Sequence, residues 1–327
     1  PPGISEFDEF RWWEPNELLN SWKNNEVRLP PPIVTLIRDL VFEIEKSGNL
    51  ADACEELSRK RPSGYHRIEF APYIECMPIR TETLPPATHT NCYIIGEVGG
   101  ERVIVDPASK CEESIISLAS KIKEVQLSGS KIVGTIFTHR HPDHIGDLNK
   151  ISKIYDAPIW ATSETHEQIP DVKERIILRE GSEFVLNGPS GQTSWQIIET
   201  FGHCPGHICI IGESGIISGD NCVGVGSILV PSGEGHMGKY IQGLKRLKGF
   251  NPKMLFPGHG PLIANPEKLL NKYILHRENR HEGVFRAIKD GFNTLREITK
   301  FVYMDDIGIN YALAEDQVLA HVKQLIK

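Results

Sequence analysis

Short apolar, β-branched runs alternate with amphipathic stretches along the middle of the chain. Such runs predict buried strands near residues 131–138, 196–200, 215–220 and 254–256. Residues 115–124 and 239–248 carry apolar side chains at helical spacing and predict helices. This alternation predicts two sheets covered by helices, which is an α/β protein with an αββα sandwich architecture.

The two ends of the chain have a helical pattern instead. Near the N-terminus, helices are expected to begin near Pro15 and to cover 33–44 and 50–61. Beyond residue 264, further helices are expected over 266–289, 294–301 and 312–327. We therefore expect an N-terminal helical extension (1–65), a central domain (66–264) and an all-helical or winged-helix-like C-terminal domain (265–327).

Composition and charge narrow the class of partner. The chain has a net charge of −7, which gives no reason to expect tight binding to a membrane surface, and the C-terminal segment lacks the basic run expected for duplex DNA. Its seven cysteines are scattered without a CxxC pair, as is typical of reduced thiols in an intracellular compartment. We therefore expect an intracellular protein. Because the chain begins Pro1-Pro2-Gly3 without Met, it is expected to be either cytoplasmic or a mitochondrial or plastid protein from which a targeting segment was removed. The oligomeric state stays open.

Residues with metal-binding chemistry follow the predicted strands. The strongest motif is Thr-His-Arg-His-Pro-Asp-His at 138–144, and His203, Asp220 and His259 each follow another apolar run. Imidazoles and carboxylates suit zinc and its divalent neighbours. The complete set comprises His139, His141, Asp143, His144, His203, Asp220 and His259. It is too large for one tetrahedral zinc and predicts two divalent ions, preferably Zn²⁺, with manganese or iron as alternatives.

Together these motifs resemble the metallo-β-lactamase superfamily. The resemblance rests on residues 138–144, Gly-His at 202–203, Ser-Gly-Asp at 218–220 and Pro-Gly-His-Gly at 257–260, with Asp106 matching the first motif. It covers about residues 67–264 and implies that the central domain is a catalytic domain with the superfamily fold. By this resemblance, one metal is held by His139, His141 and His203, the other by Asp143, His144 and His259, and Asp220 bridges them.

The resemblance also implies a metal-dependent hydrolase. In this superfamily a water or hydroxide bridges the two metals, and such ions lower the pKa of bound water to about 7. Asp143 is then expected to orient this nucleophile or to pass a proton. Antibiotic-cleaving members usually depart from this pattern in the second-metal set, so antibiotic hydrolysis is not expected.

The substrate has two interpretations. Residues 273–282 and the helical tail resemble the lactamase-β-like endoribonucleases, which cut single-stranded RNA using zinc. His276 and Arg280 would then line the substrate pocket or serve packing. Against this stand the acidic pI of about 6.0 and the lack of an aromatic ladder. The alternative is a hydrolase of a small thioester, ester or lactone, resembling the glyoxalase II-like branch, or of a CoA-linked compound.

Other interpretations carry less weight. The segment from Phe10-Arg11-Trp12-Trp13 to Leu29-Pro30-Pro31-Pro32 resembles the tail of some Nudix hydrolases, but the Nudix catalytic box is absent, and a helical packing extension is preferred. His207 is expected to be structural or pocket-lining, and His89 and His236 to be surface residues. A non-catalytic scaffold is disfavoured by the complete ligand set. The di-iron redox branch is disfavoured because no flavodoxin partner domain is found.

Overall fold

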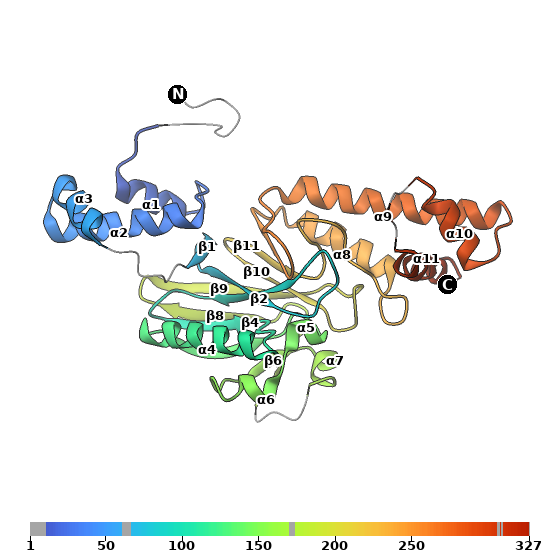
Figure 1. Cartoon of the computed structure of the whole chain (residues 1–327), viewed down its shortest axis with the longest axis horizontal. Helices are drawn as coiled ribbons and strands as arrows, with labels where there is room; N and C mark the ends of the chain where they lie inside the picture. Colours follow the sequence, from blue (N-terminus) through green and yellow to red (C-terminus); the bar gives the residue numbers. More distant parts are fainter. Residues whose placement is uncertain (1–10, 61–66, 170–173, 306–307, 309, 327) are drawn as a thin grey trace. The chain divides into compact units, whose positions relative to one another are not determined.

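The computed structural model describes residues 11–60, 67–169, 174–305, 308 and 310–326. The chain divides into two compact units, Pro1–Cys76 and Met77–Lys327 (Figure 1). The division falls within a strand, β2 (Ile74–Arg80). The domain boundaries expected at 65/66 and 264/265 stay predictions.

The first unit is mainly helical, as its amphipathic pattern predicts. It contains α1 (Pro15–Lys23), α2 (Pro31–Ser47), α3 (Leu50–Arg59) and the strand β1 (Ile68–Ala71), which pairs with β2. Proline lacks a backbone N–H and is tolerated in the first turn of a helix, so Pro15 and Pro31 can open α1 and α2. Leu19, Trp22 and Val34 form a small apolar core.

The first sheet of the second unit continues from β2 in chain order. Its strands are β3 (His89–Ile95), β4 (Glu101–Val105), β5 (Lys131–Ile136), β6 (Ile159–Ala161) and β7 (Arg175–Ile177). The strands β3 and β4 form an antiparallel pair, whereas β4 to β7 are parallel. The carboxyl ends of parallel strands share one edge of a sheet, so the loop after β5 begins at that edge.

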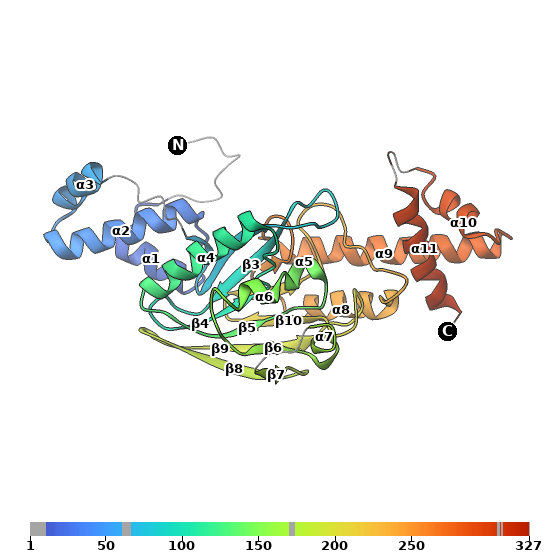
Figure 2. The same cartoon turned by 60° about the horizontal axis from the view of Figure 1, so that its bottom comes forward.

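The second sheet is mostly antiparallel. It contains β8 (Glu183–Gly188), β9 (Gly191–Glu199), β10 (Ile208–Gly212), β11 (Gly215–Gly219) and β12 (Leu255–Pro257), in the order β12-β11-β10-β9-β8. Within this sheet β11 and β12 pair in parallel, because the chain crosses over between them through α8 (Met237–Gly249). Figure 2 shows the two sheets as stacked layers.

Helices cover both outer faces of this sheet pair. On the first sheet, α4 (Glu112–Leu127) packs Leu118 and Ile122 into one core cluster with Ile94 and Ile104. On the second, α8 and α9 (Pro266–Lys289) contribute to another cluster (Figure 1). The predicted αββα sandwich is therefore confirmed.

Three short helices follow β5 and β6, namely α5 (Pro142–Ile145), α6 (Leu148–Ile151) and α7 (Ser163–His166). The motif at 138–144 thus runs directly into α5. A longer helix is expected from Asp147 to Tyr155, but α6 ends after one turn. Beyond it the chain continues in turns, and Tyr155 lies against β5, where its hydroxyl group is 2.9 Å from that of Thr135.

The C-terminal helices α10 (Leu295–Val302) and α11 (Tyr311–Leu325) pack against α9. Val284, Ala287, Ile298 and Val318 form the buried part of this contact. The described residues from 266 onward form helices and no strand; the choice between an all-helical and a winged-helix-like domain stays a prediction. Among the described helices, none combines the length and the apolar character that crossing a bilayer requires.

Candidate metal centre

The structure brings all seven predicted residues together. Five of them lie on the loops that follow β5, β9, β11 and β12, and Asp143 and His144 lie in α5, directly after the first of these loops. Three overlapping groups have candidate ligand atoms within 4.8 Å of one another: His139, His141 and His203; His139, His144 and Asp220; and Asp143, His144 and His259. Residues that are far apart in the sequence thus share one small volume.

Hydrogen bonds between the loops hold this arrangement. The Ile208 backbone N–H donates to the Thr138 carbonyl at 2.8 Å, and the Gly258 N–H donates to the Gly219 carbonyl at 2.8 Å. From β3, the Asn91 N–H donates to the Gly258 carbonyl at 2.7 Å. Each loop is therefore fixed through a neighbouring loop or strand.

In the first group, two rings are oriented by acceptors that cannot donate. His203 Nδ1 donates to the Leu229 carbonyl at 2.8 Å, and His141 Nε2 lies 2.7 Å from Glu234 Oε1. A carbonyl and a carboxylate only accept, so the hydrogen sits on these outer nitrogens. The inner nitrogens, His203 Nε2 and His141 Nδ1, lie 2.9 Å apart.

The third ring of this group is oriented by a hydroxyl group. Thr138 Oγ1 donates to Asp106 Oδ2 at 2.6 Å, so it accepts from His139 Nδ1 at 3.0 Å. This leaves a lone pair on His139 Nε2, which lies 3.1 Å from His141 Nδ1. Three nitrogen lone pairs then face one another without a shared hydrogen, an arrangement that a divalent cation satisfies.

In the second group, Asp143, His144 and His259, the outer nitrogen of each ring again donates to an acceptor, and more carboxylate oxygens lie nearby. His144 Nδ1 donates to Asp106 Oδ2 at 2.9 Å, and His259 Nδ1 donates to the His89 carbonyl at 2.9 Å. The inner Nε2 atoms of His144 and His259 lie 3.2 Å apart. Asp143 Oδ2 lies 3.4 Å from His259 Nε2. Nitrogen and oxygen donors of this kind fit a second divalent cation.

Asp220 lies between the two groups. Its carboxylate oxygens are 3.4 Å from His144 Nε2, 3.4 Å from His259 Nε2 and 3.7 Å from His203 Nε2. It is 7% exposed, and its Oδ1 has no hydrogen-bond partner in the described part of the chain. A buried carboxylate oxygen without a donor suits a cation, because burial otherwise penalises an unpaired charge.

Two histidines of the first group and two of the second have pKa values shifted in opposite directions. Burial lowers the pKa of His139 well below its usual value and that of His203 to about 4. Burial acts the same way on His144 and His259, but there the neighbouring carboxylates, Asp220 above all, outweigh it. They raise the pKa of His144 well above its usual value and that of His259 to about 9.

Asp143 stays ionised. Burial acts to raise its pKa, but the hydrogen bond with His259 and the nearby His144 outweigh this effect and lower the pKa to about 2. The carboxylate is therefore charged across the neutral range. Its side chain is 18% exposed and that of His141 is 22% exposed, whereas the side chain of His144 is completely buried. The centre is thus accessible from the side of Asp143 and His141.

Two glycines make room for this packing. A Cβ atom at Gly258 would collide with Asp220 Oδ1 and lie 2.7 Å from His144 Cε1. Gly219 has a φ of +47°, and a Cβ there would lie 2.8 Å from His207 Nε2. The loops after β11 and β12 therefore need glycine next to the carboxylate that they place.

Sequence reasoning missed Glu234. It accepts from His141 and forms an ion pair with Arg140, whose Nε lies 3.0 Å from Glu234 Oε2. One signal was present, because Glu234 is the only acidic residue between 221 and 236. The Leu229 carbonyl that orients His203 carries no such signal, since every residue has a carbonyl.

The remaining histidines fall outside the central group. The His207 side chain is buried, and its Nε2 accepts the Asp220 backbone N–H at 3.0 Å, so it supports the loop. The exposed side chain of His89 lies beside Thr88, and His236 caps α8. Arg280 donates to the Val302 carbonyl, which is a packing contact.

An αββα sandwich that gathers imidazoles and carboxylates on its loops defines a metal-binding hydrolase class. A family model described as "Metallo-beta-lactamase superfamily" matches residues 85–259. The chain belongs to this superfamily and is a metal-dependent hydrolase.

Relatives by sequence carry lactamase-like and thioesterase names. The chain is 27% identical to "Beta-lactamase-like protein 2 homolog" of Caenorhabditis elegans over 246 residues, which is 73% of this chain and 79% of that protein. It is 26% identical to "Atrochrysone carboxyl ACP thioesterase" of Aspergillus fumigatus over 206 residues, 62% of this chain and 60% of that protein. Neither name denotes a nuclease or a Nudix hydrolase, so these relatives support neither the endoribonuclease branch nor the Nudix tail.

Solved structures confirm the fold. A beta-lactamase domain protein from Burkholderia ambifaria has a TM-score of 0.68 at 20% identity, covering 83% of this chain and 90% of that one. A metallo-beta-lactamase family protein from Thermus thermophilus has a TM-score of 0.63 at 20% identity, covering 79% of this chain and 94% of that one. At this identity the likeness concerns the fold alone.

Proposed function

We propose that this chain hydrolyses a small thioester or related ester with the help of two divalent metal ions. The observation that carries the proposal is the convergence of five imidazole rings, each with its outer nitrogen on an acceptor, around the carboxylate of Asp220. A thioester is favoured among substrates because a relative is named a thioesterase.

In this proposal, Asp143 has two roles and each other predicted residue has one. His139, His141 and His203 would hold one ion, Asp143, His144 and His259 would hold the other, and Asp220 would be shared between them. Such ions supply an activated water and polarise the acyl carbonyl. Their chemical identity stays a matter for measurement, with Zn²⁺ as the first candidate and manganese or iron as alternatives.

On the accessible side, Arg140 is paired with the carboxylate of Glu234 and is thus not free to follow a phosphate backbone. Asp143 is ionised there, and Glu234 adds a second carboxylate whose charge is balanced by Arg140. Phosphate backbones are normally bound along a basic groove, with bases stacked on aromatic rings. In the hydrolysis of a thioester, Asp143 can orient the attacking water and accept its proton.

The test is a direct comparison of substrates. Zinc-loaded protein is assayed with short-chain acyl-CoA and acyl-pantetheine thioesters, with thiol release as the readout, and with a labelled single-stranded RNA. We expect thioester hydrolysis that falls by about 10²–10⁴-fold in Asp143→Ala. Glu183→Gln, an exposed carboxylate on β8, is the matched control and retains activity.

The alternative function is single-stranded RNA cleavage. It would replace the proposal if the zinc-loaded protein cut RNA in a manner that depends on Asp143 and released no thiol from any thioester. Absence of both activities in a protein that binds two metal ions would overturn both proposals.

A further inference from the structure

The loop between β11 and α8, residues 220–236, passes beside the metal centre. Its Leu229 carbonyl accepts the hydrogen on His203 Nδ1. In the neutral ring, Nε2 is then the atom with the lone pair, and it faces His141 and Asp220. The position of this carbonyl therefore selects which nitrogen of His203 faces the centre.

Two buried residues of the C-terminal helices hold the loop on either side of Leu229. Gln317 in α11 accepts the Val230 N–H at 3.3 Å and donates to the Val230 carbonyl at 2.8 Å. Arg277 in α9 donates to the Ile228 carbonyl and, at 2.9 Å, to Gln317 Oε1. Their contacts thus fix the peptide groups just before and just after Leu229.

This network is costly for the stability of the fold. Arg277 is 2% exposed and Gln317 is 7% exposed, and Arg277 Nε has no hydrogen-bond partner in the described part of the chain. A buried guanidinium whose hydrogen bonds are incomplete is often less stabilising than an apolar side chain of the same size. Besides its contact over the Tyr240 ring, at 5.4 Å from the ring centroid, Arg277 directs its hydrogen bonds to the loop and to Gln317, which holds the same loop.

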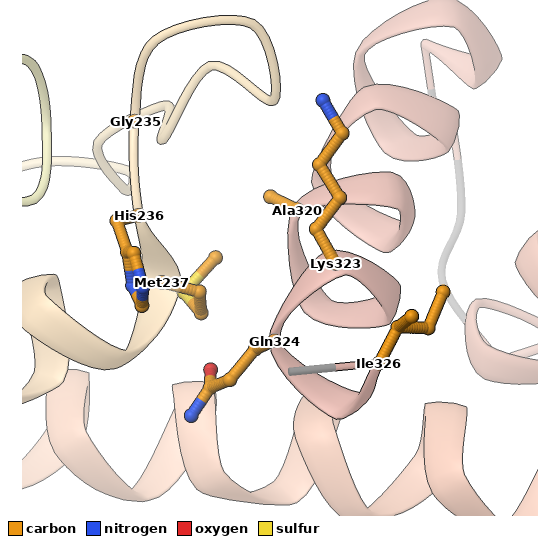
Figure 3. Close-up of a pocket in the computed structure, with 7 residues that line it drawn as sticks. All are labelled: Gly235, His236, Met237, Ala320, Lys323, Gln324 and Ile326. Carbon is orange, nitrogen blue, oxygen red and sulfur yellow. The ribbon is translucent and has the colours of Figure 1, made fainter.

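Farther along the loop, polar contacts again set its distance from α11. Asp316 accepts the Ser232 N–H at 3.1 Å and the Ser232 hydroxyl at 2.6 Å, and Lys323 Nζ donates to the Ser232 carbonyl at 2.6 Å. Next to these contacts lies a cavity of about 260 Å³ between the start of α8 and α11 (Figure 3). Beside this cavity, hydrogen bonds join the loop to α11 in addition to the apolar cluster that Val230 and Ala320 share.

We propose that Arg277 and Gln317 are positioning residues of the metal centre. They hold the Leu229 carbonyl, which keeps His203 Nε2 directed at the centre. The C-terminal helices are then a functional part of the centre and more than a covering layer on the second sheet. This inference rests on the proposed role of His203 as a metal ligand.

The experiment compares two neighbouring positions of α11 in the whole chain. Gln317→Met keeps the side-chain volume and removes the hydrogen bonds to the loop. Val318→Ala is the matched control, since Val318 is fully buried in the cluster between α9, α10 and α11. Both variants are expected to lower the melting temperature, so stability does not distinguish them.

Two readouts do distinguish them. The first is the ring tautomer of His203 in metal-free protein, measured by long-range ¹⁵N–¹H correlation. The second is the affinity for Zn²⁺, measured by competition with a chelator. We expect Gln317→Met to give a mixture of His203 tautomers and to weaken binding of one Zn²⁺ by about 10–100-fold. Val318→Ala is expected to change neither quantity.

A milder variant keeps the test valid if Gln317→Met fails to fold. Arg277→Lys retains the charge but cannot donate to the Ile228 carbonyl and Gln317 Oε1 in one rigid fork, so a smaller loss of Zn²⁺ affinity in the same direction is expected. Unchanged tautomer and affinity in a folded variant at either position would overturn the inference.

His203→Ala separates this inference from the proposed function. If His203→Ala weakens Zn²⁺ binding and Gln317→Met does not, the positioning role is wrong and the ligand role stands. If His203→Ala leaves Zn²⁺ binding unchanged, the ligand set itself is wrong, and the positioning role is overturned with it.

Discussion

The two halves of the candidate metal centre, one with His139, His141 and His203 and the other with Asp143, His144 and His259, differ in the charges around their buried histidines. His139 and His203 have lowered pKa values, because burial penalises their charged forms and the neighbouring histidines add to this effect, which outweighs the attraction of Asp220. His144 and His259 have raised pKa values, because carboxylates surround them despite burial. Around neutral pH, His139 and His203 therefore present lone pairs, whereas His259 holds a proton.

This difference in pKa determines how many protons each half must release when it binds a cation. A metal ion entering the first half displaces no proton from His139 or His203 around neutral pH. A metal ion entering the second half would displace the proton on His259, and it would gain the attraction of Asp143 in return. The two ions should therefore respond differently to pH and to substitution.

The largest expected effect comes from the residue that the halves share. In Asp220→Asn, the bridging negative charge is lost while the shape of the side chain is kept. We expect the second ion to be lost and kcat/KM to fall on the order of 10³-fold. Metal content by mass spectrometry and thiol-release kinetics measure the two effects. Retention of two ions and of near-normal activity would show that Asp220 does not link the halves.

A smaller effect is expected from a substitution that touches the first half alone. Glu234→Gln removes the carboxylate that accepts from His141 Nε2 at 2.7 Å. Loss of such an outer partner typically weakens metal binding by about 10–100-fold. Chelator competition should show this loss for one ion only. An equal loss for both ions would contradict the independence of the halves.

The smallest expected effect is the pH dependence of metal binding. The pKa of His259 is raised to about 9, so in metal-free protein its ring is protonated at pH 6–8 and must release that proton. Affinity at the second half should therefore rise by up to about tenfold per pH unit for each proton displaced. At the first half, the pKa of His203 is about 4, so no such rise from this ring is expected above pH 5.

Calorimetric titration with Zn²⁺ in buffers of different ionisation enthalpy counts the released protons directly. Proton release should accompany the binding of one ion far more than that of the other. Equal proton release for both ions would show that the contrast in pKa has no consequence for metal loading.

Local pattern was sufficient to predict most of the elements. The helix expected over 266–289 is α9 itself, since Asn265 caps its first turn and Pro266 opens it. The strand before the motif at 138–144 is β5. The helix after that motif was predicted too long: α6 ends at Ile151, and the chain continues in hydrogen-bonded turns to Tyr155.

The candidate site was predictable only as far as its side chains carry distinctive chemistry. Histidine and aspartate residues that follow apolar strands can be recognised in the sequence, and all seven predicted residues lie close together in the structure. The role of the Leu229 carbonyl could not be predicted, because it depends on the geometry of a loop. The contacts of Arg277 and Gln317 could not be predicted either, because they join residues 40 or more positions apart. Sheet order likewise depends on packing that no single segment encodes.

The contact between Gln317 and Val230 also bears on how the protein is made. Val230 and Gln317 are separated by 87 positions, so their hydrogen bond can form only after Gln317 has been synthesised. During synthesis, the sandwich can begin to fold as soon as β12 leaves the ribosome, but the loop beside His203 gains its support only after α11 has followed. Binding of both metal ions is thus expected to be a late step, which follows the packing of the C-terminal helices against this loop.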